Sequence, residues 1–429
     1  MELNVAGYDI DILEEIPDRY AKSGATGVAL SGMDVILSKL LTEEDFNRLS
    51  ARCLRNTVPR SSIQQHADPS LSYTFDTAET ITVPVPQGIG ETPARLQDQA
   101  GTYHIAQPAV HAIDDVSLFG THGVVRLSNG RVILETALAR KRLFKRKLSM
   151  RPLDVLYYEL ADYLPSRPIL DTPLVPMVWG YGNYHHWIFN CLTMLQGIEQ
   201  YRKQTGDICQ LLIPPDPPSW IPESLQFFGF APEQLIEWKY RYGDARRVVI
   251  PTIRRIENPT LHKQTNDRTI RRKIVSPNAC QWLQETARAR LSDTSAMEFS
   301  SRVIVSRADA GRRMLQNRDE LYDLLYDRGF EEYQLANLTF EEQVALFANA
   351  DCVVSPHGAG LSNLVFADQC DVLEILGTHA TKPTYYLLAN SAGHRYRFVI
   401  GEQPHDGDSD DDIYLAPERL EQGLDALGY

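Results

Sequence analysis

Short apolar runs alternate with longer amphipathic segments from about residue 172 to residue 250. The runs VPMV (175–178), CQLLI (209–213) and RVVI (247–250) have the length and composition of buried strands. A glycine-containing loop, GYGN (180–183), follows the first run, and residues 184–204 have the length and patterning of a helix. We therefore predict strand–loop–helix units in this part of the chain.

The same alternation restarts after an arginine-rich polar stretch at residues 254–273. It predicts strands at 303–305, 352–354 and 372–376, and helices at 317–327, 340–349 and 361–367, the first of them closed by Gly329. Strands and helices that alternate at this spacing form parallel sheets with helices on both faces. The pattern thus predicts an α/β protein with two Rossmann-like units joined near residue 275.

The N-terminal part of the chain has a different pattern. Residues 1–60 predict short helices, one of which starts at TEED (42–45). Residues 70–135 are β-rich, with a predicted strand at 77–83 and a predicted hairpin at Asn129-Gly130, which separates two apolar runs. We expect this region to be β-rich and to lie outside the two Rossmann-like units.

The charge of the chain limits its partners. The net charge of −13 over 429 residues argues against a nucleic-acid partner, which would require a basic face. The 43 basic residues comprise 10 lysines and 33 arginines. An acidic, lysine-poor chain is typical of haloadapted proteins of salt-accumulating archaea, whose carboxylates keep the surface hydrated. Compositional drift in a GC-rich genome is the alternative.

Three sequence features bear on location. The six cysteines form no Cys-x-x-Cys pair, which predicts free thiols in a reducing compartment. The start of the chain lacks the basic and apolar regions of a signal peptide, and no apolar run reaches bilayer length, so we expect a cytoplasmic protein. One basic segment, RKRLFKRK from Arg140 to Lys147, predicts a solvated helix face or, alternatively, peripheral contact with anionic lipid headgroups or a phosphate-bearing acceptor.

The stretch SPHGAGLSN (355–363) follows a predicted strand and precedes a predicted helix. Ligands of doubly wound sheets bind beyond the carboxyl ends of the strands. Gly358 and Gly360 would let the backbone approach a ligand, and the N–H groups of the following helix would bind an anion such as pyrophosphate. A plain strand-to-helix turn is the alternative at this position.

A second stretch, VSRADAGRRMLQN (305–317), places Arg307 at the end of a predicted strand and Arg312 and Arg313 in the next loop. Guanidinium groups bind phosphate oxygens in a bidentate manner, so this stretch predicts a second anion contact. An exposed, solvated loop is the alternative.

A third stretch, WGYGNYHHWIFN (179–190), predicts a helix capped by Asn183 with His185 and His186 in its first turn. His186 has the chemistry of a general base that takes a proton from an acceptor hydroxyl, and a helix N-terminus would keep it neutral. A core or capping histidine is the alternative.

Several other chemistries are excluded by missing residues. The chain has no Gly-x-Ser-x-Gly elbow and no P-loop, which excludes a lipase-type hydrolase and a P-loop NTPase. The acidic stretch from Asp406 resembles the start of a calcium loop, but Asp411 and Pro417 replace its glycine and its glutamate. We interpret this stretch as a solvated loop.

Together the three stretches resemble glycosyltransferase family 61 over about residues 175–376. The closest correspondence is LTFEEQVALFANADCVVSPHGAGLSNLVFA (338–367), with NYHHWIFN and SRADAGRRMLQN as further matches. The resemblance implies an α/β fold of GT-B type with a pair of Rossmann-like domains, and the β-rich N-terminal region lies outside it. It also implies a nucleotide-sugar donor, usually UDP-linked, a glycan acceptor, an inverting mechanism, no required metal and no cofactor. A lipid-linked glycan is one alternative for the acceptor.

The resemblance also assigns expected roles to residues of this chain. His186 and His357 are expected to be catalytic, with Asn183 and Asn190 in the cleft. The expected donor-binding residues are Arg307, Arg313, Asn317, Gly358, Ala359, Gly360, Asn363 and Glu374. The expected domains are 1–170, an acceptor-side domain at 171–274, a donor-binding domain at 275–400 and an acidic C-terminal segment at 401–429.

The chain departs from the family pattern in two places. Asn190 stands where the family usually has an acidic residue, and Arg318 stands where Asn317 is usually followed by Glu. An amide cannot act as a base, so the expected base rests on His186. A catalytically inactive relative that binds nucleotide sugar or glycan, and a nucleotide-sugar hydrolase, are the alternatives to a transferase.

Overall fold

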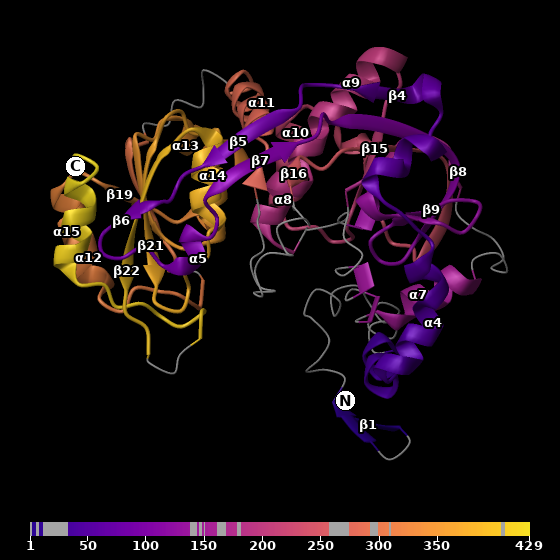
Figure 1. Ribbon diagram of the computed structural model, residues 1–429, viewed down its shortest axis with the longest axis horizontal. Helices are drawn as coiled ribbons and strands as arrows, with labels where there is room; N and C mark the ends of the chain where they lie inside the picture. The colour runs from indigo at the N-terminus through magenta and orange to yellow at the C-terminus, as the bar shows by residue number, and fades with distance from the viewer. Residues whose placement is uncertain are drawn as a thin grey trace.

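Two sheets with their helices lie in separate halves of the computed structural model (Figure 1). The structure describes the backbone of residues 2–5 and 8–11, and residues 33–137, 144–145, 148–149, 151–160, 169–177, 182–256, 274–291, 299–308, 310–404 and 408–429. The expected α/β composition is confirmed. Most of the basic segment 140–147, and residues 180–181 of the expected loop 180–183, lie outside the described residues.

The first sheet has ten strands and combines strands from the N-terminal and middle parts of the chain. They are β3 (Thr57–Val58), β4 (Ser72–Thr74), β8 (Ala109–Phe119), β9 (Val124–Arg126), β10 (Val132–Ile133), β11 (Ile169–Leu170), β12 (Leu174–Pro176), β13 (Gln210–Ile213), β14 (Leu235–Glu237) and β15 (Tyr242–Pro251). The order along its main path is β14-β13-β12-β15-β8-β9-β10-β3. Strands β12 to β14 run parallel, whereas β15 pairs antiparallel with β8 over most of its length. The expected boundary near residue 170 therefore does not separate two sheets.

The helix expected at 184–204 is interrupted. Helix α8 (Tyr184–Asn190) ends at Cys191, the 3₁₀ turn η5 (Leu192–Met194) follows, and α9 (Leu195–Thr205) completes the segment. The Thr193 hydroxyl donates to the Phe189 carbonyl four residues earlier, a bond that bends helices. Helix α9 ends at Gly206, whose φ of +76° is left-handed. The expectation of one continuous helix was wrong.

The second sheet has six strands, all of which run parallel. They are β6 (Gln87–Gly88), β18 (Arg302–Val305), β19 (Glu331–Tyr333), β20 (Cys352–Pro356), β21 (Asp371–Gly377) and β22 (Arg395–Gly401). Their order is β19-β18-β20-β21-β22-β6. The chain moves outward in one direction from β18 to β19 and in the other from β20 to β22, so the order reverses between β18 and β20. Ligands bind at such a switch point in doubly wound sheets.

Helices cover both faces of the second sheet (Figure 1). They are α11 (Pro277–Arg288), α12 (Arg318–Asp327), α13 (Phe340–Ala348), α14 (Thr384–Ala392) and α15 (Pro417–Asp425), with the 3₁₀ helices η9 (Leu335–Asn337) and η10 (Ala359–Phe366). Along β18, Val303 and Val305 pack with α13 and η10, whereas Ile304 packs with α12 and α15. This alternation follows the two-residue period of a strand. Because helices cover both faces of the strand, all three residues of the run 303–305 are apolar. The strands expected at 303–305, 352–354 and 372–376 are confirmed, but the helix expected at 361–367 is a 3₁₀ helix.

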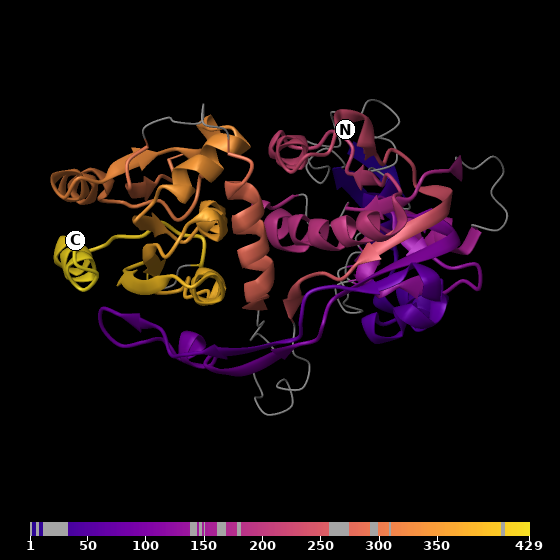
Figure 2. The same cartoon turned by 90° about the horizontal axis from the view of Figure 1, so that it is seen from above.

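An arm from the N-terminal part of the chain connects the two halves. Strands β5 (Glu79–Val83) and β7 (Gly101–Ile105) pair antiparallel, and the turn between them carries β6 and α5 (Ala94–Gln97). The arm runs along one side of both halves (Figure 2), and β6 extends the edge of the second sheet by pairing with β22. The buried Arg254 anchors its base, because it contacts Asp76 at 2.6 Å and Ser276 at 2.8 Å.

The N-terminal expectations are met in part. Helix α4 (Glu43–Arg55) begins at Thr42 with a capping box, as expected, but β1 (Glu2–Val5) and β2 (Tyr8–Asp11) pair as strands where helices were expected. The Asn129-Gly130 hairpin joins β9 and β10, although only Gly130 has a positive φ. The remaining elements are η1 (Arg60–His66), η2 (Pro69–Leu71), η3 (Leu134–Ala137), α7 (Pro152–Leu160), α10 (Trp220–Phe227), η6 (Pro232–Gln234), β16 (Arg255–Ile256) and β17 (Ile274–Val275).

Candidate functional site

A cavity of about 180 Å³ lies at the carboxyl ends of β18 and β20, where the strand order of the second sheet reverses. Its walls come from the two stretches that the sequence singled out as anion contacts, together with η9. The lining residues are Val305, Ser306, Arg307, Ala310, Leu335, Ser355, Gly358, Ala359 and Gly360. The structure therefore brings together SPHGAGLSN and the start of SRADAGRRMLQN.

The two glycines of this cavity are required by different neighbours. A Cβ on Gly358 would lie 1.9 Å from Nη1 of Arg307, so the guanidinium lies directly against the glycine backbone. Gly358 has an extended backbone, with φ of −165°, which any residue adopts. A Cβ on Gly360 would instead meet the apolar side chains of Leu335 at 2.8 Å and Val305 at 2.9 Å. Gly358 thus leaves room for a cation, and Gly360 allows close packing.

His357, just before these glycines, is held by a buried carboxylate. Its Nδ1 lies 2.5 Å from Oε1 of Glu374, which is fully buried, and the Tyr396 hydroxyl donates to Oε2 of the same carboxylate at 2.6 Å. Burial lowers the pKa of His357, against the opposing effect of Glu374. A neutral His357 therefore donates its Nδ1–H to Glu374. The structure places Glu374 behind His357, and its expected contact with a donor stays a prediction.

A cluster of cations surrounds one carboxylate beside this site. Asp410 lies 2.9 Å from Arg312, 3.5 Å from Arg313 and 3.7 Å from Lys382. Although burial opposes the effect, Arg313 and Lys382 hold the pKa of Asp410 below its usual value. Burial, reinforced by Arg313, lowers the pKa of Lys382, and both cations also act on the pKa of His357. Arg313 itself is buried and has a left-handed φ of +54°.

Sequence reasoning missed Lys382. Lys382 lies outside the three motifs. It is the only lysine after Lys273 in a lysine-poor chain, and this isolated position in the sequence could have marked it as a candidate site residue. Sequence reasoning also missed the acidic loop at 408–412 as a partner of the arginines, because the two segments lie about a hundred residues apart in sequence.

The start of α8 connects the first half of the molecule to η10. Asn183 caps the helix, as expected, by accepting from the His186 N–H. The Tyr184 hydroxyl donates to Asn363 at 2.6 Å, and Nδ1 of the buried His185 lies 3.1 Å from the Ser362 hydroxyl. This helix start is therefore the contact between the first half and SPHGAGLSN.

An aromatic contact continues from this helix toward His357. The ring of Tyr385 lies 5.7 Å from that of His185 and 4.9 Å from that of His357. Of the two neighbouring histidines, His185 is thus the one that the structure connects to His357 through packed rings.

His186 contacts a different set of residues. Its Nδ1 lies 3.4 Å from Nη1 of Arg255 and 3.5 Å from Nδ2 of Asn190, and the same Arg255 nitrogen donates to Oδ1 of Asn190 at 3.2 Å. Asn190 and Arg255 are buried. The sequence did not single out Arg255, which lies at the start of the arginine-rich stretch.

The sequence model of Glycosyltransferase 61 matches residues 184–373, from the start of α8 into β21. Residues 184–373, less than half of the chain, are similar to glycosyltransferase family 61. This match confirms the resemblance inferred from the motifs and supports glycosyltransferase activity. A search of curated proteins gives no match.

The family 61 segment contains the whole cavity, His186, His357 and Arg255. Asn183 and Glu374 each lie one residue outside it, and Lys382 and Asp410 lie beyond it.

Two of the expected donor-binding residues form hydrogen bonds with other residues of the protein. Asn317 donates to the Leu415 carbonyl at 2.9 Å and accepts from the Leu415 N–H, so it holds the C-terminal segment. Asn363 is fully buried between Tyr184 and Gln343. Neither residue lines the cavity, and their roles in donor binding stay predictions.

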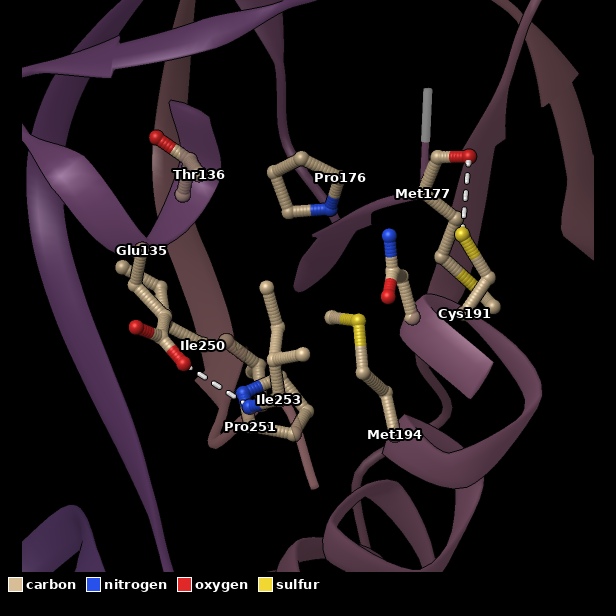
Figure 3. A pocket seen from close by; sticks show the side chains of 11 residues that line it. Glu135, Thr136, Pro176, Met177, Cys191, Met194, Ile250, Pro251 and Ile253 are labelled. Carbon is tan, nitrogen blue, oxygen red and sulfur yellow. Dashed lines mark hydrogen bonds between the residues drawn. The ribbon is translucent and has the colours of Figure 1, made fainter. Parts of the chain in front are cut away.

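A second cavity, which Asn190 helps to line, lies in the first half. Figure 3 shows it from close by, with Met177, Cys191 and Met194 on one side. The cavity has a volume of about 20 Å³, room for one water. Carbon and sulfur atoms of Met177, Cys191 and Met194 form much of its wall, while the Glu135 carboxylate accepts from the Ile253 N–H at 2.8 Å. This cavity is a packing gap and cannot hold a sugar ring.

Three further findings bear on partners and location. All six cysteines are free and buried, as the sequence predicted. Among the described residues, no helix has the length and apolar character to cross a membrane. Within the same residues, no group of three or more His, Cys, Asp or Glu side chains is placed to bind a metal ion.

Proposed function

We propose that the chain transfers a sugar from a nucleotide-sugar donor to a hydroxyl of a glycan acceptor. The proposed donor is a UDP-linked sugar. The observation that carries this proposal is the cavity at the switch point of the second sheet, inside the family 61 segment, with Arg307 held against Gly358. Phosphate oxygens are the natural ligands of such a guanidinium.

The donor diphosphate occupies this cavity. Ligand pockets usually have volumes of about 300–1,000 Å³, so a cavity of about 180 Å³ takes the diphosphate and leaves the rest of the donor outside. Arg307 and Arg313 neutralise the phosphates, with Lys382 as a third cation. The N–H groups at the start of η10 add donors, because the first N–H groups of a helix have no partner within it.

Asp410 has a defined place in this proposal. Its carboxylate rests against Arg312, Arg313 and Lys382, which are the charges that a diphosphate would attract. Donor phosphates therefore compete with Asp410 for these cations, and binding displaces it.

We also propose that the reaction uses two domains of GT-B type, with the acceptor on the side of residues 171–274 and the donor on the side of residues 275–400. The contact of α8 with η10 supports this arrangement, because it brings Tyr184 and His185 of the first half against the donor side. The transfer is inverting and needs no metal, since cations replace one at the leaving diphosphate. A lipid-linked acceptor reached through the segment 140–147 is part of the same proposal.

Incubation with a panel of nucleotide sugars tests the proposal. Nucleotide release that requires a glycan acceptor supports a transferase. Release without acceptor would identify a hydrolase, and binding without release would identify an inactive relative; both results would contradict the proposal.

A further inference from the structure

The hydrogen-bond partners of His186 determine which of its nitrogens carries the proton. Two side chains face Nδ1, a guanidinium nitrogen of Arg255 at 3.4 Å and the Nδ2 of Asn190 at 3.5 Å. A guanidinium has donors and no acceptor, and the amide nitrogen of asparagine also only donates. Nδ1 of His186 therefore accepts, and it carries no hydrogen.

Arg255 also fixes which way the Asn190 amide points. Nη1 of Arg255 donates to Oδ1 of Asn190 at 3.2 Å. If the amide were turned over, its nitrogen would face the guanidinium and two donors would oppose each other in a buried place. The charge of Arg255 thus directs the amide nitrogen of Asn190 toward His186.

We infer that Asn190 and Arg255 are positioning residues that hold His186 as the neutral tautomer with its proton on Nε2. In this form His186 is a hydrogen-bond donor at Nε2. Protonation of Nδ1 would also place a positive imidazole against a guanidinium, which like-charge repulsion disfavours. The same molecule contains the opposite arrangement, because the Glu374 carboxylate holds the proton of His357 on Nδ1.

This inference deepens the proposed function and rests on it for the role of His186. It departs from the sequence expectation of a base, because a nitrogen that carries a proton cannot accept one from a sugar hydroxyl. His186 instead donates from Nε2 to an oxygen of the acceptor and orients it. As that oxygen bonds to the sugar and the bond from the sugar to the diphosphate breaks, the proton of the hydroxyl passes to water and not to His186. The acidic residue that family 61 usually has at the position of Asn190 would accept from Nδ1–H and leave Nε2 as an acceptor.

The first test is nitrogen NMR of the whole chain labelled at histidine nitrogens, with no substrate present. The His186 signals are assigned by their loss in His186→Gln. The inference predicts that Nδ1 has the downfield shift of an unprotonated nitrogen and Nε2 the upfield shift of a protonated one. The opposite pattern, or a doubly protonated ring, would overturn it.

Asn190→Asp is the informative variant, because it replaces the amide donor by a carboxylate that only accepts. The proton of His186 should move to Nδ1, while the His357 signals, which report a distant carboxylate, stay unchanged. If the wild-type pattern persists in this variant, Asn190 does not set the tautomer. Because this measurement needs no turnover, it holds or fails independently of whether the chain transfers sugar.

Turnover distinguishes a donor from a base. A glutamine amide retains a donor near the position of Nε2, so His186→Gln should keep turnover within about tenfold of wild type, whereas His186→Ala should lose more. General bases contribute about 10²–10⁴-fold, and an amide cannot replace them. Equal losses of this size in the glutamine and alanine variants would show that His186 acts as a base.

Discussion

Replacing Gly358 by alanine should displace one cation from the cavity and leave the fold intact. The added Cβ would lie 1.9 Å from Nη1 of Arg307, whereas ordinary contact begins at 3.4 Å, so the guanidinium must move by about 1.5 Å. The backbone at Gly358 is extended and accepts alanine without strain. The atoms that must move are the end of a flexible side chain, so we expect the free energy of unfolding to change by less than about 0.5 kcal/mol.

The effect on nucleotide binding should be much larger. A charge-assisted hydrogen bond contributes about 1.5–3 kcal/mol, and about 1.4 kcal/mol corresponds to a factor of ten in affinity. Gly358→Ala should therefore weaken UDP binding roughly 10- to 100-fold in calorimetry. Arg307→Ala should have an effect of the same size. The double variant should bind no more weakly than Arg307→Ala alone, because both changes remove one contact.

Gly360→Ala is the matched control. Its Cβ would meet Val305 and Leu335, which are packed apolar side chains, so overpacking should cost about 1–3 kcal/mol of stability. Its effect on affinity should be smaller than that of Gly358→Ala. UDP binding of Gly358→Ala at wild-type strength, or full additivity with Arg307→Ala, would show that the Arg307 guanidinium against Gly358 does not bind the nucleotide.

Three further changes test other parts of the site and its support. Asp410→Asn should strengthen UDP binding by about two- to fivefold, as expected for a competing ion pair that is partly exposed, and weaker binding would contradict the competition. Glu374→Gln should lower the free energy of unfolding by about 1–3 kcal/mol, since an amide cannot accept from both of its buried donors; equal stability in urea titration would contradict this. Arg254→Met should cost about 3–5 kcal/mol, because it removes a buried cation from the partly buried carboxylates of Asp76 and Glu79. The exposed pair of Arg246 should cost less than about 1 kcal/mol in Arg246→Ala, and similar losses would contradict the anchoring of the arm.

The sequence predicted the second sheet well because each of its central strands is buried on both faces. Val303, Ile304 and Val305 alternate between two helix layers, so the whole run is apolar and stands out from its surroundings. The segments proposed to bind phosphate were singled out for a related reason, since glycine and arginine occur there in short runs next to strand ends.

The features that sequence reasoning missed depend on contacts between distant segments. Strand β6 has only two residues, too few to show an alternation of apolar and polar positions. It is identified as a strand only by its pairing with β22. Lys382 and Asp410 meet through the fold of the C-terminal loop. The role of Arg255 could not be inferred because it follows from one nitrogen that contacts both Asn190 and His186. The interpretation of the acidic composition as haloadaptation, and the cytoplasmic location, stay predictions.

A crystal structure of the chain with UDP would show whether the diphosphate occupies the cavity at the switch point of the second sheet. We expect diphosphate density at the carboxyl ends of β18 and β20, within hydrogen-bond distance of Arg307 and Arg313, with the Asp410 carboxylate displaced from the cations. Diphosphate bound in another part of the molecule, with Arg307 still against Gly358 and Asp410 still in place, would contradict this expectation.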